Sequence, residues 1–159
     1  MSQHQPSPVT EGSTGVLAQS DWAALIPHAG TMCLLDAVCA HDERSIHATS
    51  TSHARADHPL RGPDGLHAVH LAEYGAQAMA VHGALLARER GEQTVRPGRL
   101  VSLRDVQLFD EYVDGLDGRL DVHAECLYAD HGGSQYVFRV EHQGRLLASG
   151  RAAVMHSPG

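Results

Sequence analysis

The segment LHAVHLAEYGAQAMAVHGALLARER, residues 66–90, decides the fold that this sequence can adopt. Ala, Val, Leu, Met and Gly cover nearly the whole circumference of the helix that it predicts, and Gly91 follows its end. A helix on a protein surface is apolar on one side only, so this composition predicts a helix that other elements enclose on most sides. We therefore expect a buried central helix over residues 66–90.

Four polar side chains recur along this helix at spacings of three, three and four residues: His67, His70, Glu73 and Gln77. Residues at these spacings share one helix face. Burial raises the pKa of a carboxyl group, so Glu73 could donate a proton while a nearby neutral imidazole accepts one. This pairing suits removal of a proton beside a carbonyl group with loss of a hydroxyl group from the next carbon.

Two other interpretations of this polar stripe, formed by His67, His70, Glu73 and Gln77, stay open. It could be the exposed edge of the helix, or its H-x-x-H-x-x-E order could present three metal ligands on one face. No further ligand is indicated and the order differs from H-E-x-x-H, so we predict no metal site. His82 lies off the stripe and is expected to be structural.

The chain after the helix is predicted to form strands, because its apolar and polar residues alternate. Turn-forming residues separate four such segments, which are residues 98–109, 118–129, 134–143 and 145–156. The predicted fold class is therefore α+β, with an antiparallel sheet that curls around one long helix.

The chain before the helix predicts a short helix, two strands and a loop. Ser20 or Asp21 is expected to cap the short helix, which ends near Pro27. Residues 32–53 predict two strands around a turn at His41–Arg44, and residues 54–65 form a Pro- and Gly-rich loop.

Composition narrows the classes of function. A length of 159 residues predicts one domain, over residues 20–156, after a disordered tail at residues 1–19. The net charge of -7 argues against nucleic acid as a partner, and the absence of lysine excludes Schiff-base chemistry on a lysine. The N-terminus lacks the pattern of a secretory signal, and the central helix carries charge, so we predict no membrane span. Three cysteines without a CxxC motif favour reduced, buried thiols in a cytoplasmic protein.

Several motifs together resemble one enzyme family. IPHAGTMCLLDAV (residues 26–38), EYGAQAMA (residues 73–80) and the strand segments 98–127 and 136–155 resemble the bacterial 3-hydroxyacyl-acyl-carrier-protein dehydratases. The resemblance spans roughly residues 22–155. LAEYGAQAMAVHGALL (residues 71–86) further resembles the dehydratase branch of aryl-polyene, xanthomonadin and dialkylresorcinol pigment gene clusters.

This resemblance implies the hotdog fold, a long helix wrapped by an antiparallel sheet. It also implies a homodimer or heterodimer of hotdog chains, with a His of one chain facing the acid of the other. On this match Glu73 is the catalytic acid and Gln77 its companion. The substrate would be an aryl or polyenyl 3-hydroxyacyl chain on the phosphopantetheine of an acyl carrier protein, and no cofactor is needed.

The sequence departs from that family where the family keeps its catalytic His. It has no G-H-F-P loop. His58, in the segment DHPL, lies fifteen residues before Glu73, but this segment matches an earlier Asn-x-Pro-Phe motif of the family about as well. We rank the replacement bases as His70, then His67, then His58, with a partner protein as a further source.

Other groups near the helix start are expected to bind the substrate. The backbone N–H groups of Ala68 and Val69 would polarise the thioester carbonyl. Arg61, Arg96 and Arg99 could contact the carrier protein or its phosphate, although arginines are equally common as solvated surface charge.

The function predicted from the sequence is dehydration of a 3-hydroxyacyl thioester to the trans-2-enoyl thioester. Two alternatives stay open. Hotdog thioesterases also use a helix carboxylate, which in them activates water. The missing G-H-F-P loop instead favours a non-catalytic or half-site subunit that pairs with a second hotdog protein.

Overall fold

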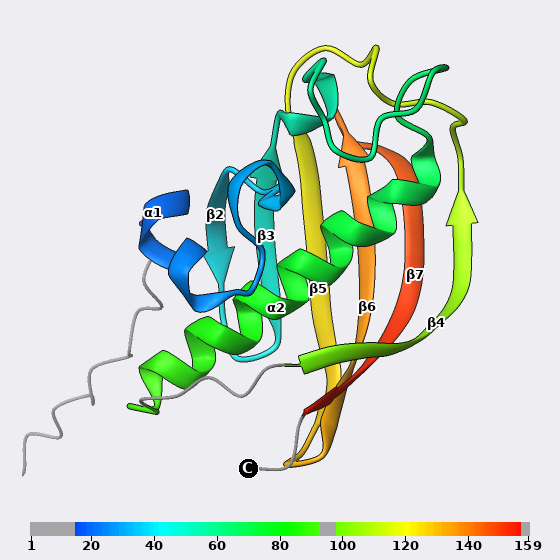
Figure 1. The fold of residues 1–159 in the computed structure, drawn as a ribbon. Coiled ribbons are helices and arrows are strands. Elements are labelled where there is room, and N and C mark those ends of the chain that lie inside the picture. Colours follow the sequence, from blue (N-terminus) through cyan, green and yellow to red (C-terminus); the bar gives the residue numbers. More distant parts are fainter. Residues whose placement is uncertain (1–14, 93–97, 157–159) are drawn as a thin grey trace, which may run out of the picture.

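The computed structural model describes residues 15–92 and 98–156, and within them a curved antiparallel sheet holds one long helix against its face (Figure 1). The sheet order is β1-β2-β3-β5-β6-β7-β4. The strands are β1 Leu17–Ala18, β2 Ala37–His41, β3 Ser45–Ser50, β4 Gly98–Leu108, β5 Leu120–Ala129, β6 Gly133–His142 and β7 Arg145–His156. The helices are α1 Gln19–Trp22 and α2 Leu71–Glu89, with single 3₁₀ turns at Ala23–Leu25, Gly30–Met32, Ser52–Ala54 and Ala68–His70. The predicted α+β class is confirmed.

The central helix is enclosed as its composition predicts. Apolar core residues of the helix recur every three or four positions and pack with strands β3, β5 and β6: Leu71, Tyr74, Ala78, Val81 and Leu85. The segment that precedes β2 adds Trp22, Leu34 and Leu35 to the same core. Burial on two sides explains why α2 lacks a broad polar face.

The start of the long helix differs from the prediction. The α-helix begins at Leu71 rather than at residue 66. The residues before it lie beside the loop at residues 111–114 and form hydrogen bonds with it. The Leu66 N–H donates to Asp114 at 2.8 Å, and the Ala68 N–H donates to the Glu111 carbonyl at 2.8 Å. These long-range hydrogen bonds hold His67 in extended backbone, so His67 is not on the helical stripe.

The remaining predicted elements agree with the structure to within a few residues. The two strands around His41–Arg44 and the four later strands are all present. The short helix begins two or three residues earlier than expected: Ala18, rather than Ser20 or Asp21, is the N-cap residue, and the Ala18 N–H donates to the Asp21 side chain at 2.9 Å. Residues 1–14 of the expected tail lie outside the described residues, whereas Leu17 and Ala18 pair with β2. No helix in the described residues has both the length and the apolarity that crossing a membrane requires.

Two glycines let the helix and the sheet approach each other around Phe138. A Cβ atom on Gly75 of α2 would lie 2.6 Å from the base of the Phe138 ring. A Cβ atom on Gly150 of β7 would lie 2.8 Å from the far end of the same ring. Phe138 is 3% exposed, so the ring fills the space that the missing side chains leave.

We predict that Gly75→Ala lowers the free energy of unfolding by about 1–3 kcal/mol, because the added methyl group overpacks the core. Gly83→Ala, on the same helix, is the matched control, because a Cβ atom on Gly83 would meet nothing within 4 Å. The control should raise stability by roughly 0.5–1 kcal/mol through helix propensity. Chemical unfolding curves measure both changes, and equal effects of the two substitutions would contradict the proposed close contact.

Candidate active site

Glu73, in the first turn of α2, is the centre of a small polar group. Its Oε1 atom lies 3.1 Å from His28 Nε2 and 3.3 Å from Gln77 Nε2. The side chains of His28 and Glu73 are 26% and 32% exposed, so both remain within reach of a ligand. The structure therefore joins two residues that the sequence predicted, Glu73 and Gln77, to a histidine that was not among the predicted site residues.

Gln77 holds this group in place through a fully buried amide. Its Oε1 atom accepts the Leu34 N–H at 2.9 Å, and its Nε2 atom donates to the Met32 carbonyl at 2.7 Å. These two bonds fix which end of the amide carries the hydrogens. The remaining N–H of Gln77 must therefore donate to Glu73.

The charge state of Glu73 differs from the prediction. The hydrogen bond from His28 lowers the pKa of Glu73, and this effect and the bond from Gln77 together outweigh the opposing effect of burial. The predicted rise in pKa is wrong for this chain, because the helix is apolar but the carboxyl group receives two hydrogen bonds. Glu73 is therefore an ionised carboxylate near neutral pH.

His67 and His70 lie at the start of the helix, and within the described residues neither forms a hydrogen bond or an ion pair with Glu73. The His67 Nδ1 atom accepts the Val69 N–H at 3.0 Å, and its ring stands edge-on to Tyr112 at 5.5 Å. His70 is partly buried at the end of the 3₁₀ turn, and its backbone N–H donates to the His67 carbonyl at 3.1 Å. Their expected roles as bases stay predictions.

His58 is buried and takes part in a chain of hydrogen bonds. Its Nδ1 atom accepts the Leu60 N–H at 3.1 Å, so in the neutral ring Nε2 carries the proton and donates to the Tyr74 hydroxyl at 3.0 Å. The chain then passes through the hydroxyl groups of Ser52, at 2.7 Å from Tyr74, and Ser50, and ends at the Leu34 carbonyl. Both ring nitrogens of His58 are thus occupied, and the chain ties its loop to Leu34.

Most of the groups expected to bind the substrate already form hydrogen bonds or ion pairs within the chain. The Ala68 N–H donates to Glu111, and the Val69 N–H donates to His67, so a thioester carbonyl would have to displace these bonds. Arg61 lies 3.4 Å from Asp114 and Arg99 lies in the exposed start of β4. Arg96 lies outside the described residues.

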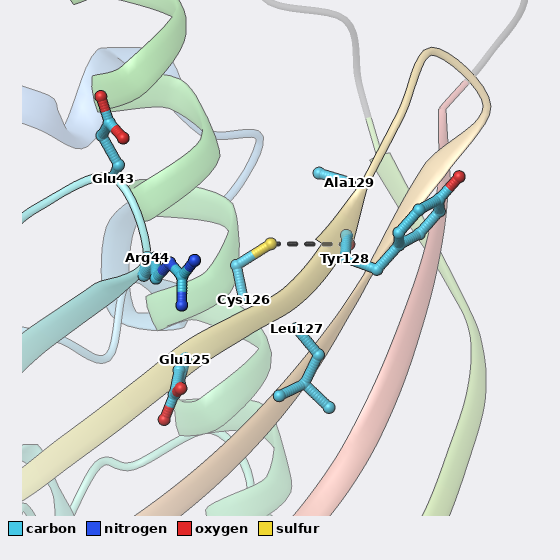
Figure 2. Close-up of a pocket in the computed structure, with 7 residues that line it drawn as sticks. All are labelled: Glu43, Arg44, Glu125, Cys126, Leu127, Tyr128 and Ala129. Carbon is cyan, nitrogen blue, oxygen red and sulfur yellow. Dashed lines mark hydrogen bonds between the residues drawn. The ribbon is translucent and has the colours of Figure 1, made fainter.

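The hollow shown in Figure 2 is separate from this group. It has a volume of about 290 Å³ and lies beside the β2–β3 turn, toward the C-terminal half of α2. Its lining consists of Glu43, Arg44, Glu125, Cys126, Leu127, Tyr128 and Ala129. Among the residues that the structure describes, no group of three or more metal-ligating side chains gathers at either place.

Comparison with known proteins identifies the family. The family model of the ApeP dehydratase matches residues 20–158. The chain belongs to the ApeP-like dehydratase family. No curated protein matches the chain.

Solved structures agree with this assignment and establish the hotdog fold. The dehydratase heterocomplex ApeI:P from Xenorhabdus doucetiae contains a chain with 25% identity and a TM-score of 0.76, covering 84% of this chain and 89% of that one. A thioesterase of Staphylococcus aureus, at 14% identity and a TM-score of 0.58, covers 76% and 92% and shares the fold alone. AziG from S. sahachiroi, at 23% identity and a TM-score of 0.54, covers 77% and 90%.

Three other buried histidines link stability to pH. The His82 Nε2 atom donates to the Asp42 carbonyl, and its Nδ1 atom accepts a hydrogen bond from the Tyr136 hydroxyl, each at 2.7 Å. A ring with one donor and one acceptor nitrogen is a neutral imidazole. His53 donates to the Leu116 carbonyl, and His58 is bonded as described above. Burial is the main cause that lowers the pKa of all three imidazoles below the usual value of 6.5.

We predict that the free energy of unfolding falls as pH drops below about 6.5. In this range the unfolded chain binds protons on His53, His58 and His82 that the folded chain does not bind. Each of these histidines lowers the free energy of unfolding by up to about 1.4 kcal/mol per pH unit. Urea unfolding at pH 7.5, 6.5 and 5.5 measures the trend. His82→Gln should make the free energy of unfolding depend less steeply on pH, and equal stability of the unsubstituted chain at pH 7.5 and 5.5 would refute the link.

Proposed function

We propose that this protein dehydrates a 3-hydroxyacyl thioester, carried by an acyl carrier protein, to the trans-2-enoyl thioester. The observation that carries the proposal is the contact of Glu73 with His28 and Gln77 in a chain of the ApeP-like dehydratase family. Loss of water needs one group that takes a proton from C2 and one that gives a proton to the leaving hydroxyl. A carboxyl group and an imidazole 3.1 Å apart can exchange protons with groups on two adjacent carbon atoms.

The pigment branch supplies the proposed substrate class. The ApeP match and the resemblance of residues 71–86 support an aryl or polyenyl 3-hydroxyacyl chain in polyene pigment synthesis. Glu73 is proposed as the catalytic carboxyl group and Gln77 as the residue that orients it. His28 is proposed as the imidazole, with His70, His67 and His58 as the alternatives from the sequence, and the N–H groups of Ala68 and Val69 as the proposed carbonyl contacts.

The alternative in which this chain is a subunit is favoured by a specific comparison. Its relative from Xenorhabdus doucetiae belongs to the dehydratase heterocomplex ApeI:P. We propose that this protein likewise pairs with a second hotdog dehydratase chain, with a homodimer as the alternative. The pair would then bind the phosphopantetheine-linked substrate of the carrier protein.

Strand β4 supports this pairing. It lies at the end of the sheet and pairs with β7 on one side only within the described residues. An unpaired strand edge is a template for another strand, and exposed apolar residues next to it mark an interaction surface. The apolar residues of β4 and the one directly after it are between 37% and 49% exposed: Leu100, Val101, Leu103, Val106, Leu108 and Phe109.

We predict that Glu73→Gln lowers kcat/KM for water loss by about 10²- to 10⁴-fold, because the amide cannot exchange a proton with the substrate. The amide oxygen can still accept the two existing hydrogen bonds, so the fold should persist. Glu89→Gln is the matched control, since Glu89 lies on the same helix and also contacts a histidine, His41, at 2.6 Å. Mass spectrometry of the acyl carrier protein follows the loss of water.

The same assay separates the alternatives. His28→Gln should lower the rate of water loss as Glu73→Gln does, whereas His70→Ala and His67→Ala should retain most of the rate. The reverse result would assign the role of the catalytic imidazole to His70 or His67 instead of His28. Release of free acid instead of water would reject dehydration in favour of thioester hydrolysis. Activity only after addition of the second hotdog chain would identify this protein as a half-site subunit.

We predict that Val101→Asp weakens association with the second hotdog chain at least about tenfold, because a charge would be buried at the β4 edge. Leu127→Asp is the control, because Leu127 is similarly exposed, at 49%, but lies on the inner strand β5. Light scattering after gel filtration measures the mass of the complex. Equal weakening by both substitutions would show that β4 is not the interface.

A further inference from the structure

We propose that Tyr74 and His58 are positioning residues of the dehydration, which hold the amide donor of Gln77 against Glu73 through a chain of buried hydrogen bonds. Neither residue has to touch the substrate. The inference rests on the proposed function, and it gives His58 a role other than that of the base expected from the sequence.

The hydroxyl groups of Tyr74, Ser52 and Ser50 form a hydroxyl chain in which the direction of every hydrogen bond is fixed. The Leu34 carbonyl can only accept, so the Ser50 hydroxyl donates to it at 2.5 Å. A hydroxyl group has one hydrogen, so in the 2.9 Å contact between the two serines Ser52 is the donor. By the same count Tyr74 donates to Ser52 at 2.7 Å, and the His58 Nε2 atom donates to Tyr74 at 3.0 Å.

The far end of the hydroxyl chain gives the same directions. The His58 Nδ1 atom accepts the Leu60 N–H at 3.1 Å, so the neutral ring carries its hydrogen on Nε2. Burial lowers the pKa of His58, which keeps the ring neutral near pH 7. Burial also raises the pKa of Tyr74 to about 12, so Tyr74 keeps the hydrogen that it donates. Each donor from His58 onward therefore points toward Leu34.

The hydroxyl chain closes a ring with the helix turn that carries Glu73. Leu34 accepts the chain at its carbonyl, and its N–H donates to Gln77 Oε1 at 2.9 Å. Tyr74 and Gln77 lie three residues apart on α2, so the ring leaves the helix at one residue and returns at the other. The Gln77 Nε2 atom then donates to Glu73 at 3.3 Å. A shift of Leu34 would turn this amide and move the donor away from the carboxylate.

Burial makes the ring a rigid support. Its side chains and that of His58 are all buried: Ser50, Ser52, His58, Tyr74 and Gln77. Solvent cannot replace a hydrogen bond lost there, and buried hydrogen bonds in a network support one another. The Glu73 side chain is 32% exposed, whereas His58 is 5% exposed with both ring nitrogens occupied. His58 thus lies where a support is useful and where a base would not reach the substrate.

A matched pair of substitutions separates positioning from stability. Tyr74→Phe breaks the hydroxyl chain. Tyr136→Phe removes a second buried tyrosine hydroxyl, which donates to His82 at 2.7 Å, roughly 14 Å along α2 from Glu73. Each substitution removes one hydrogen bond between a buried tyrosine and a buried histidine, but only the first lies in the ring that includes Gln77. A purely structural role of Tyr74 predicts similar effects of the two.

We expect Tyr74→Phe to lower kcat for water loss by about 10- to 100-fold, because small displacements of catalytic groups are costly. KM should change less than about threefold, because Tyr74 does not touch the substrate. Tyr136→Phe should change kcat less than about twofold. The assay uses the full chain, alone and with a second hotdog dehydratase, and 3-hydroxyhexanoyl acyl carrier protein. Circular dichroism checks folding, and Ser50→Ala, which breaks the same chain, is the second variant should Tyr74→Phe not fold.

The titration of Glu73 is a readout that does not depend on catalysis. The hydrogen bonds from His28 and Gln77 lower the pKa of Glu73, so a loosened Gln77 donor should raise it. NMR of chains labelled with ¹³C at the glutamate carboxyl carbons follows this titration, and the Glu73 signal is the one missing in Glu73→Gln. Its midpoint should move to higher pH in Tyr74→Phe and stay unchanged in Tyr136→Phe.

Two substitutions of His58 distinguish positioning from general base catalysis. His58→Gln keeps an N–H group that can donate to the Tyr74 hydroxyl, whereas His58→Ala keeps none. If His58 positions the chain, kcat should fall less in His58→Gln than in His58→Ala. Equal losses of about 10²-fold or more in both would show that the imidazole itself reacts.

Three results would overturn the inference: equal effects of Tyr74→Phe and Tyr136→Phe on kcat, an unchanged titration of Glu73 in Tyr74→Phe, and equal losses in the two His58 variants. Absence of water loss by the unsubstituted chain, both alone and with the second chain, would instead reject the proposed function. The titration of Glu73 would then still show whether the hydroxyl chain holds Gln77, so the two failures are distinguishable.

Discussion

The buried amide of Gln77 is the constraint on which the rest of the site depends. It lies on a largely apolar helix, and two of its three hydrogen bonds reach the segment at residues 32–34 while the third reaches Glu73 on the same helix. A buried polar group left without a partner costs about 1–3 kcal/mol, so the segment at residues 32–34 must lie against this point of the helix. That position brings His28, four residues before Met32, to the carboxyl group one turn before Gln77.

The backbone of Leu34 links this amide to a second network. Its N–H donates to Gln77, and its carbonyl accepts the Ser50 hydroxyl, which leads through Ser52 and Tyr74 to His58. Hydrogen bonds in such buried chains support one another in a low dielectric. These hydrogen bonds therefore hold the loop that contains His58 against the segment that follows His28, although within the described residues His58 forms no hydrogen bond or ion pair with Glu73.

The parts of this arrangement that depend on local pattern could be predicted from the sequence. The apolar circumference of residues 66–90 predicted an enclosed helix, alternation predicted the later strands, and helical spacing predicted that Glu73 and Gln77 lie together. The helix start was wrong, because bonds to residues 111–114 pull the preceding residues into extended backbone.

His28 could not be found from spacing. It reaches Glu73 across 45 residues of chain, and no local periodicity encodes a contact between a loop and a helix. The one available signal was the Pro-His pair in IPHAG, which the resemblance treated as a motif without a chemical role. The lowered pKa of Glu73 has the same origin, because it depends on that contact rather than on the apolar composition of the helix.

The His28 contact also bears on the difference between dehydration and thioester hydrolysis within one fold. An ionised carboxylate on the central helix suits both reactions, since it can accept a proton from C2 or from an attacking water. The leaving groups differ. A thiolate departs as a stable anion, whereas a hydroxyl group departs readily only when it receives a proton. Thioester hydrolysis therefore needs no acid for its leaving group, whereas the proposed dehydration needs both an acid and a base, and the contact of His28 with Glu73 at 3.1 Å places two such groups side by side.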